Sequence, residues 1–120
     1  MPGKIVHIEF PSADSDRAQG FWNGLFGWNF GDSGMPEMDY RMADLGDGVG
    51  AAIYSAESQP PGHAFYYYDT DDINASIARI RELGGKADDR QPVPGHGWFA
   101  VCADTEGNDF RLWQQDSGAA

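Results

Sequence analysis

The chain has 120 residues, which suffices for one domain with a hydrophobic core and is too short for two ordinary domains. Its 19 Asp and Glu outnumber 8 Lys and Arg, so the formal net charge is −11, which excludes a basic surface for nucleic acid or an anionic membrane. No apolar segment approaches the roughly 18–20 residues of a membrane span. The 7 Phe, 5 Tyr and 4 Trp provide core material, and 16 Gly and 7 Pro indicate many turns and short strands.

The chain contains a single cysteine, and its first residues lead into strand-like sequence without the apolar segment of a signal peptide. An internal disulfide is therefore impossible, and we expect a cytoplasmic protein. Cys102 lies in an apolar run with no cation beside it. We interpret it as a buried small hydrophobic residue and not as a nucleophile.

The first half of the chain predicts one helix among four strands. The helix is capped by Ser12 or Asp14 and stopped by Gly27, and its apolar residues recur at helical spacing. Gly46-Asp47-Gly48 is typical of a hairpin turn between the last two strands. The apolar helix positions are Ala18, Phe21, Trp22 and Leu25, and the predicted strands are 4–10, 28–30, 40–45 and 49–54.

The second half repeats this order after a polar, proline-containing linker at 55–61. Asp71 or Asp72 caps a helix that carries Ile73, Ile77 and Ile80 on one face. A shift of 58 residues lays Asp14 on Asp72, Leu25 on Leu83 and Gly27 on Gly85. We expect two modules, 4–56 and 62–115, within one domain, 1–120, because neither module could bury its sheet alone. The predicted strands of the second module are 63–68, 86–88, 97–102 and 109–114.

Alternation along the strands separates two faces. One face is apolar and suits the side that the helices cover; it contains Val6, Ile8, Phe10, Ala51, Ile53, Ala64, Tyr66, Tyr68, Phe110 and Leu112. The other mixes aromatic and polar residues and suits a partly hydrated concave pocket, or alternatively an ordinary solvent-facing surface. It contains Ile5, His7, Glu9, Gly50, Ala52, Tyr54, His63, Phe65, Tyr67, Asp109, Arg111 and Trp113.

The two modules, with Val6-His7-Ile8 at the start and Asp104–Trp113 at the end, resemble the vicinal oxygen chelate superfamily. The 21–28 stretch and the Asp-x-Glu-Gly-Asn turn match its common signatures, and the chain is most similar to glyoxalase-like proteins described as related to lactoylglutathione lyase. The resemblance implies an α+β fold in which two βαβββ modules form an open, cup-shaped mixed sheet with helices on the outer face. It also implies a ligand or metal inside the cup and a homodimer.

The metal-binding members of this superfamily take ligands from four positions, which fall here on His7, Ala52, Phe65 and Arg111. Ala and Phe have no donor atom, and a guanidinium repels a cation, so we expect neither a metal nor another cofactor. An atypical site built from His7, Glu9 and His63 is an alternative, and His96 stands alone. A further alternative is that His7 is a cup-wall residue hydrogen-bonded to Glu9, Arg111 or a neighbouring strand.

We expect a small-molecule-binding protein with a metal-free aromatic cup. Its polar anchors are His7, Glu9 and Arg111, and its walls are Tyr54, Phe65, Tyr67 and Trp113. The alternative is a lyase or isomerase that uses an atypical metal site or His7 and Glu9 as an acid–base pair. A third interpretation is an interaction domain whose cup holds no ligand.

The sequence also indicates the roles of a tyrosine run, an acidic cluster, a proline-containing segment and Arg111. Tyr66 and Tyr68 are expected to face the helix and Tyr67 the cup. The acidic cluster at 69–72 is expected to be a helix N-terminus. Residues 91–97 are expected to form a loop, either a rim of the cup or a plain connector. Arg111 has two candidate partners, which are Glu9 and an anionic group of the ligand, and the remaining alternative is an exposed side chain.

Overall fold

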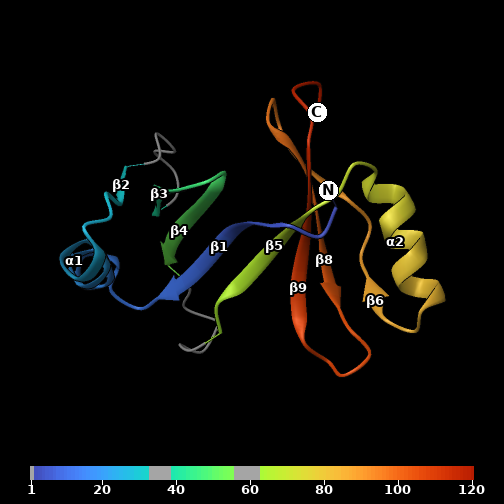
Figure 1. The fold of residues 1–120 in the computed structure, drawn as a ribbon, viewed down its shortest axis with the longest axis horizontal. Helices are drawn as coiled ribbons and strands as arrows, with labels where there is room; N and C mark the ends of the chain where they lie inside the picture. Colours follow the sequence, from blue (N-terminus) through green and yellow to red (C-terminus); the bar gives the residue numbers. More distant parts are fainter. Residues whose placement is uncertain (1, 33–38, 56–62) are drawn as a thin grey trace. The chain divides into compact units, whose positions relative to one another are not determined.

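The computed structural model describes residues 2–32, 39–55 and 63–120, so the predicted linker beyond Ser55 lies outside the described residues. The first half contains β1 (Ile5–Ser12), α1 (Ser15–Phe26), β2 (Gly31–Asp32), β3 (Tyr40–Gly46) and β4 (Val49–Ser55) (Figure 1). The second half contains β5 (Phe65–Asp69), α2 (Ile73–Glu82), β6 (Lys86–Ala87), β7 (Gln91–Val93), β8 (Gly97–Ala103) and β9 (Asp109–Gln115).

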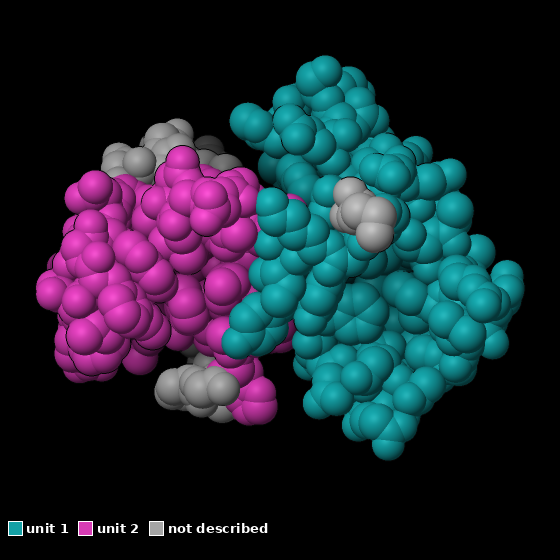
Figure 2. All heavy atoms as spheres, viewed as in Figure 1, with its two compact units in different colours: residues 1–5, 66–120 teal, residues 6–65 magenta. Residues whose placement is uncertain are grey.

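The chain divides into two compact units, which Figure 2 shows in different colours. Unit 2 comprises residues 6–65, and unit 1 comprises residues 1–5 and 66–120. Each unit carries one helix and one mixed sheet, in the element order strand, helix, then strands. The predicted α+β fold with an internal repeat is therefore confirmed.

The sheet of unit 2 has the strand order β2-β3-β4-β1, with β1 parallel to β4 and the other pairs antiparallel. One face of this sheet is covered by α1, as the apolar alternation predicts. The buried core consists of Phe30, Ala43, Ala51 and Ile53, with Phe10, Ala18, Trp22, Trp28 and Leu45 packed against it.

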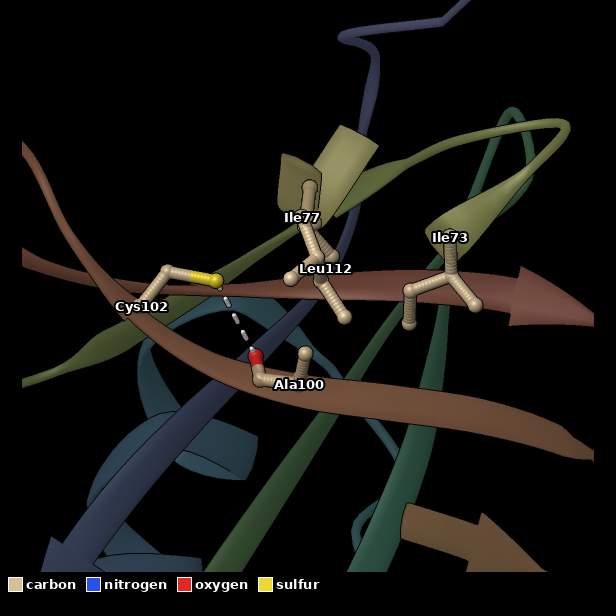
Figure 3. Close-up of a cluster of buried hydrophobic side chains, with 5 residues drawn as sticks. All are labelled: Ile73, Ile77, Ala100, Cys102 and Leu112. Atoms are coloured by element: carbon tan, nitrogen blue, oxygen red, sulfur yellow. Dashed lines mark hydrogen bonds between the residues drawn. The ribbon is translucent and has the colours of Figure 1, made fainter. Parts of the chain in front are cut away.

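The sheet of unit 1 has the order β5-β9-β8-β6, and β7 also pairs with β8. Strands β5 and β9 are parallel, whereas β8 is antiparallel to β9, β6 and β7. Figure 3 shows the buried side chains where α2 meets this sheet, which are Ile73, Ile77, Ala100, Cys102 and Leu112. The predicted burial of Cys102 and of the isoleucine face of α2 is confirmed.

The two helices begin with the same local structure. Asp14 and Asp72 are the N-cap residues, at φ −144°, ψ 97° and φ −142°, ψ 97°, and each carboxylate accepts a hydrogen bond from a backbone N–H in the first turn. Gly27 ends α1 at φ 68°, a left-handed conformation in which glycine has no steric penalty. The cap and stop residues read from the sequence are thus confirmed for α1.

The strand predicted at 28–30 is wrong, because the structure places the short strand β2 directly after it. The side chain of Asn23 takes the place of a neighbouring strand: its Oδ1 accepts from Phe30 N at 2.9 Å, and its Nδ2 donates to Phe30 O at 3.4 Å. With both backbone groups of Phe30 bonded to one side chain, this segment needs no partner strand. We call this pair of hydrogen bonds the Asn23 clasp.

Three other expectations are corrected. Residues 91–93 form β7, antiparallel to β8, and not a loop. Tyr66 is 42% exposed and is no core residue, although Tyr68 packs against the core as predicted. In α1 the apolar residues divide: Ala18 and Trp22 pack on the core, but Phe21 and Leu25 are 60% and 57% exposed. A periodic apolar pattern alone cannot show how wide the buried stripe of a helix is.

Candidate functional site

The face of unit 2 opposite α1 carries most of the predicted polar anchors. Glu9 pairs with Ala52 on β4, and Tyr54 pairs with both Pro11 on β1 and Tyr40 on β3. Residues that pair across strands share a face. His7, Glu9 and Tyr54 therefore lie on one face, together with Tyr40, which the sequence analysis did not select.

Three of these side chains form a hydrogen-bonded chain. The Tyr40 hydroxyl donates to Glu9 Oε2 at 2.7 Å and lies 3.0 Å from His7 Nε2. His7 Nε2 and Glu9 Oε2 are 3.8 Å apart, and the side chains of His7 and Glu9 are 17% and 15% exposed. A tyrosine hydroxyl thus bridges a histidine and a carboxylate at a partly buried position. We call these three residues the His7–Tyr40–Glu9 chain.

The hydrogen-bond directions in this chain determine the state of the histidine. An ionised carboxylate can only accept, so the Tyr40 hydroxyl proton points to Glu9 and the Tyr40 oxygen accepts from His7. His7 Nε2 consequently carries a proton and offers no lone pair to a metal ion. The ring lies beside Gly50, its partner on β4, where a Cβ would be in van der Waals contact with His7 Nδ1 at 3.4 Å.

The other predicted site residues lie in unit 1, with the exception of Phe65. Tyr67 on β5 pairs with Arg111 on β9, and Trp113 follows Arg111 on the same face of β9. Arg111 Nη1 donates to Phe110 O at 3.4 Å. Trp113 lies against Gly97 of the neighbouring strand so closely that a Cβ there would be 2.6 Å from its ring. Unit 1 therefore places an arginine and two aromatic residues on the same face of its strands.

The structure thus brings the predicted residues together in two groups. His7, Glu9 and Tyr54 gather in unit 2, where Phe65 is buried at 5% exposure. The second group comprises Tyr67, Arg111 and Trp113 in unit 1. A cup lined by both groups remains a prediction.

The donor set at the four superfamily metal positions does not fit a divalent cation. Ala52 and Phe65 offer no donor atom, Arg111 is cationic, and His7 Nε2 is occupied by the hydrogen bond that it donates to the Tyr40 oxygen. Within residues 2–32, 39–55 and 63–120, no three His, Cys, Asp or Glu side chains are grouped to hold a metal ion. The alternative site built from His7, Glu9 and His63 is therefore not formed among these residues.

Cys102 is unsuited to nucleophilic chemistry. It is buried, and its Sγ lies 3.6 Å from the backbone oxygen of Ala100 (Figure 3). Burial raises the pKa of the Cys102 thiol to about 11, because the thiolate would lose its hydration. The reactive thiolate is therefore scarce at neutral pH.

Residues 6–113 match the family model described as a glyoxalase-like domain. The chain belongs to the glyoxalase-like domain family. A glyoxylase-like domain-containing protein from Didymella fabae is 32% identical over 121 residues, which cover 93% of this chain and 94% of that protein. The family lies within the vicinal oxygen chelate superfamily that the sequence resembles.

Solved structures have the same fold as this glyoxalase-like chain. The methylmalonyl-CoA epimerase from Mycobacterium tuberculosis superposes with a TM-score of 0.71 at 14% identity, over 95% of this chain and 88% of that one. A glyoxalase/bleomycin resistance protein/dioxygenase superfamily member from Vibrio splendidus has a TM-score of 0.70 at 19% identity, over 94% and 99%. At these identities the likeness concerns the fold alone.

No helix among the described residues is long and apolar enough to cross a membrane.

Proposed function

We propose that this glyoxalase-like chain binds a polar small molecule without a metal, on the sheet face that carries the His7–Tyr40–Glu9 chain. The observation that supports the proposal is the bridging hydroxyl of Tyr40, at 3.0 Å from His7 and 2.7 Å from Glu9. Polar side chains fixed by mutual hydrogen bonds cost little to order when a ligand binds. The walls of the proposed cup are formed by Tyr54, Phe65, Tyr67 and Trp113. Arg111 is a further polar anchor.

The His7–Tyr40–Glu9 chain also indicates what the ligand offers. It combines the carboxylate of Glu9, which accepts hydrogen bonds, with the imidazole of His7, which donates one. Such a pair suits a ligand with both hydrogen-bond donors and acceptors, as in a hydroxy acid or an amide. We place the protein in the cytoplasm, since its single cysteine forms no internal disulfide.

The experiment compares binding by the parent chain and by Tyr40→Phe. Small carboxylates, hydroxy acids, amides and phosphates are screened by ligand-observed NMR and by thermal shift. We expect compounds that bind the parent chain to lose about tenfold or more in affinity with Tyr40→Phe, which corresponds to one charge-assisted hydrogen bond. Tyr66→Phe is the matched control, because Tyr66 is exposed and lies in unit 1. Equal loss in both variants, or binding unaffected by Tyr40→Phe, would contradict the proposal.

Metal independence is tested separately. The protein is purified without chelators, and its content of Ni, Zn, Fe and Mn is measured by mass spectrometry. We expect far less than one metal per chain, because His7 Nε2 is a proton donor and two of the other positions have no donor atom. About one metal per chain in the parent, lost in His7→Ala, would overturn this part of the proposal.

A second candidate function is acid–base catalysis. The hydroxyl of Tyr40 touches both partners, so a proton taken up at the other ring nitrogen of His7 can be balanced by transfer of the Nε2 proton to Tyr40 and of the Tyr40 proton to Glu9. Proton abstraction next to a carbonyl group is one reaction that such a chain supports, and methylmalonyl-CoA epimerases share the fold. The test follows α-proton exchange of methylmalonyl-CoA in D₂O by NMR. Exchange that depends on Glu9 and Tyr40 would favour the enzyme; its absence, with binding retained, would favour the binding protein.

A further inference from the structure

The two outer members of the His7–Tyr40–Glu9 chain are spaced like two ligands of one cation. His7 Nε2 and Glu9 Oε2 are 3.8 Å apart. Bonds from zinc to an imidazole nitrogen or a carboxylate oxygen are about 2.0–2.2 Å long, so two such ligands of one ion lie at most roughly 4.2 Å apart. Both side chains are also partly buried, at 17% and 15% exposure, where charges are screened less than at the surface. With nothing beside them, these two groups would attract a divalent cation.

The hydroxyl of Tyr40 contacts both atoms that would hold such a cation. Its oxygen lies 3.0 Å from His7 Nε2 and 2.7 Å from Glu9 Oε2. It accepts a hydrogen bond from the imidazole and donates one to the carboxylate. One uncharged group thus satisfies both partners. It also keeps on His7 Nε2 the proton that a metal ion would have to replace.

Tyr40 is itself a poor metal ligand in this arrangement. A tyrosine hydroxyl keeps its proton at neutral pH, whereas a metal ion binds the deprotonated form of its ligands. A cation could enter only after two hydrogen bonds break and His7 Nε2 loses its proton. Such a barrier matters in this chain, because its formal charge of −11 concentrates cations around it.

We propose that the Tyr40 hydroxyl is the specificity-determining group that keeps divalent cations away from His7 and Glu9. The inference rests on the proposed function, in which this face binds its ligand without a metal, and it assigns that property to a single oxygen atom. Removal of this oxygen converts a hydrogen-bonded pair into a cation site with two protein ligands.

The test is zinc binding by the whole chain at pH 7, measured by isothermal titration calorimetry after a chelator has removed metal ions and has itself been dialysed away. Zinc is the probe because imidazole and carboxylate groups are among its usual ligands. Tyr40→Ala removes the hydroxyl and leaves room for water on the ion. We expect this variant to bind one zinc ion per chain, with a dissociation constant at least about tenfold below the parent value, since hydrogen-bonded partners of metal ligands have effects of this size.

Tyr40→Phe removes the oxygen alone and keeps the ring. It should shift the affinity for zinc in the same direction, so the test remains valid if the alanine variant is unfolded. Circular dichroism checks the folding of each variant. The double variant Tyr40→Ala/His7→Ala should return to the parent value, because the imidazole is one of the two ligands of the new site.

Met42→Ala is the matched control. Met42 lies two residues beyond Tyr40 on the same face of β3, pairs with Ala52 and is 42% exposed. Its truncation opens space on this face but retains the hydroxyl. The affinity for zinc should therefore stay within about threefold of the parent value, a change of the size that a surface substitution makes.

A gain of affinity is diagnostic, because damage to the structure weakens binding sites and does not create them. Equal affinity for zinc in the parent and in both Tyr40 variants would overturn the proposal. Weaker binding in the Tyr40 variants would also overturn it, since the hydroxyl oxygen would then be a ligand and not a barrier. A gain that persists without His7 would place the new site elsewhere and have the same consequence. The comparison uses neither the organic ligand nor the metal content of the purified parent, so this inference and the proposed function fail separately.

Discussion

At the residue scale, alternation along the first strand predicted that His7 and Glu9 share a face, but it did not predict that the Tyr40 hydroxyl lies between them. Gly46 pairs with Val49 at the hairpin turn. If that register continued along β3 without interruption, Tyr40 would pair with Ser55 and lie on the face that α1 covers. The strand instead has an irregularity between Asp44 and Gly46, after which Tyr40 pairs with Tyr54. A one-residue bulge moves every earlier side chain to the opposite face. Turn chemistry in the sequence did not reveal this bulge.

The first prediction concerns the chemical reactivity of Cys102. In the native protein at pH 8, a thiol reagent such as dithiobis-nitrobenzoate should react at a small fraction of the rate seen in urea. The cause is twofold: the thiol is buried, and its pKa of about 11 leaves little thiolate at pH 8. The release of the coloured thiolate is followed by absorbance. Equal rates in the native and the unfolded protein would contradict the buried position.

The second prediction concerns pH and Asp116. Its Oδ2 accepts from Trp98 Nε1 at 3.0 Å and its Oδ1 accepts from Gly118 N at 2.9 Å. The hydrogen bond from Trp98, then that from Gly118, lowers the pKa of Asp116 below its ordinary value of 3.8. A pKa that is lower in the folded state stabilises the fold above pH 3.8, and this stabilisation is lost as pH falls through the folded-state pKa.

Asp116→Asn tests this dependence. The variant should be less stable than the parent to urea at pH 7, and the difference should shrink as the pH falls below 3.8. Asp71→Asn is a suitable control, since Asp71 precedes the N-cap of α2 in an exposed turn. A difference between Asp116→Asn and the parent that is unchanged at pH 3 would show that the carboxylate charge is not what stabilises this segment.

At the scale of single elements, local chemistry predicted the helices better than the short strands. Asp14, Asp72 and Gly27 are caps whose action depends on neighbours within four residues, so the sequence reveals them. The strand β7 has only three residues and depends on its pairing with β8, a contact that no local pattern records. The Asn23 clasp is likewise a contact over seven residues, and it replaced the predicted strand.

The third prediction concerns the close packing at Gly97, where β8 pairs with β9. Gly97→Ala should destabilise the fold by about 1–3 kcal/mol, the cost typical of forcing an extra methyl group into packed structure. An added Cβ would lie 2.3 Å from Gln114 O and 2.6 Å from the Trp113 ring, so the two strands must separate. The free energy of unfolding is measured in urea. Gly31→Ala, where a Cβ would meet nothing within 4 Å, should have little effect.

At the scale of the whole molecule, the repeat was the feature that the sequence predicted best. The shift of 58 residues aligned the two N-cap aspartates, and the structure gives them nearly identical backbone angles. The seven predicted site residues were harder to group, because they come from strands in both units. Face alternation assigns a side to each residue, but it does not tell which residues of separate strands touch.

The fourth prediction concerns net charge. With a formal charge of −11, the folded chain repels itself, so its melting temperature should rise as NaCl is increased from about 10 to 150 mM. The measurement is made at one low protein concentration throughout. Calorimetry gives the melting temperature, and KCl should act like NaCl because screening depends on ionic strength. A constant or falling melting temperature would show that attractive ion pairs outweigh the repulsion.

The Asn23 clasp also bears on the deamidation of Asn23. Asn23 is followed by Gly24, the pair in which a backbone nitrogen most readily attacks a side-chain amide and releases ammonia. In the folded chain this amide is held by two hydrogen bonds to Phe30, and Gly24 lies within α1. Conversion to aspartate would remove the donor and set a negative charge against the Phe30 carbonyl. We therefore expect fraying at the end of α1 to limit the rate of deamidation, and each deamidated molecule to lose the hydrogen bond from Asn23 Nδ2 to Phe30 O.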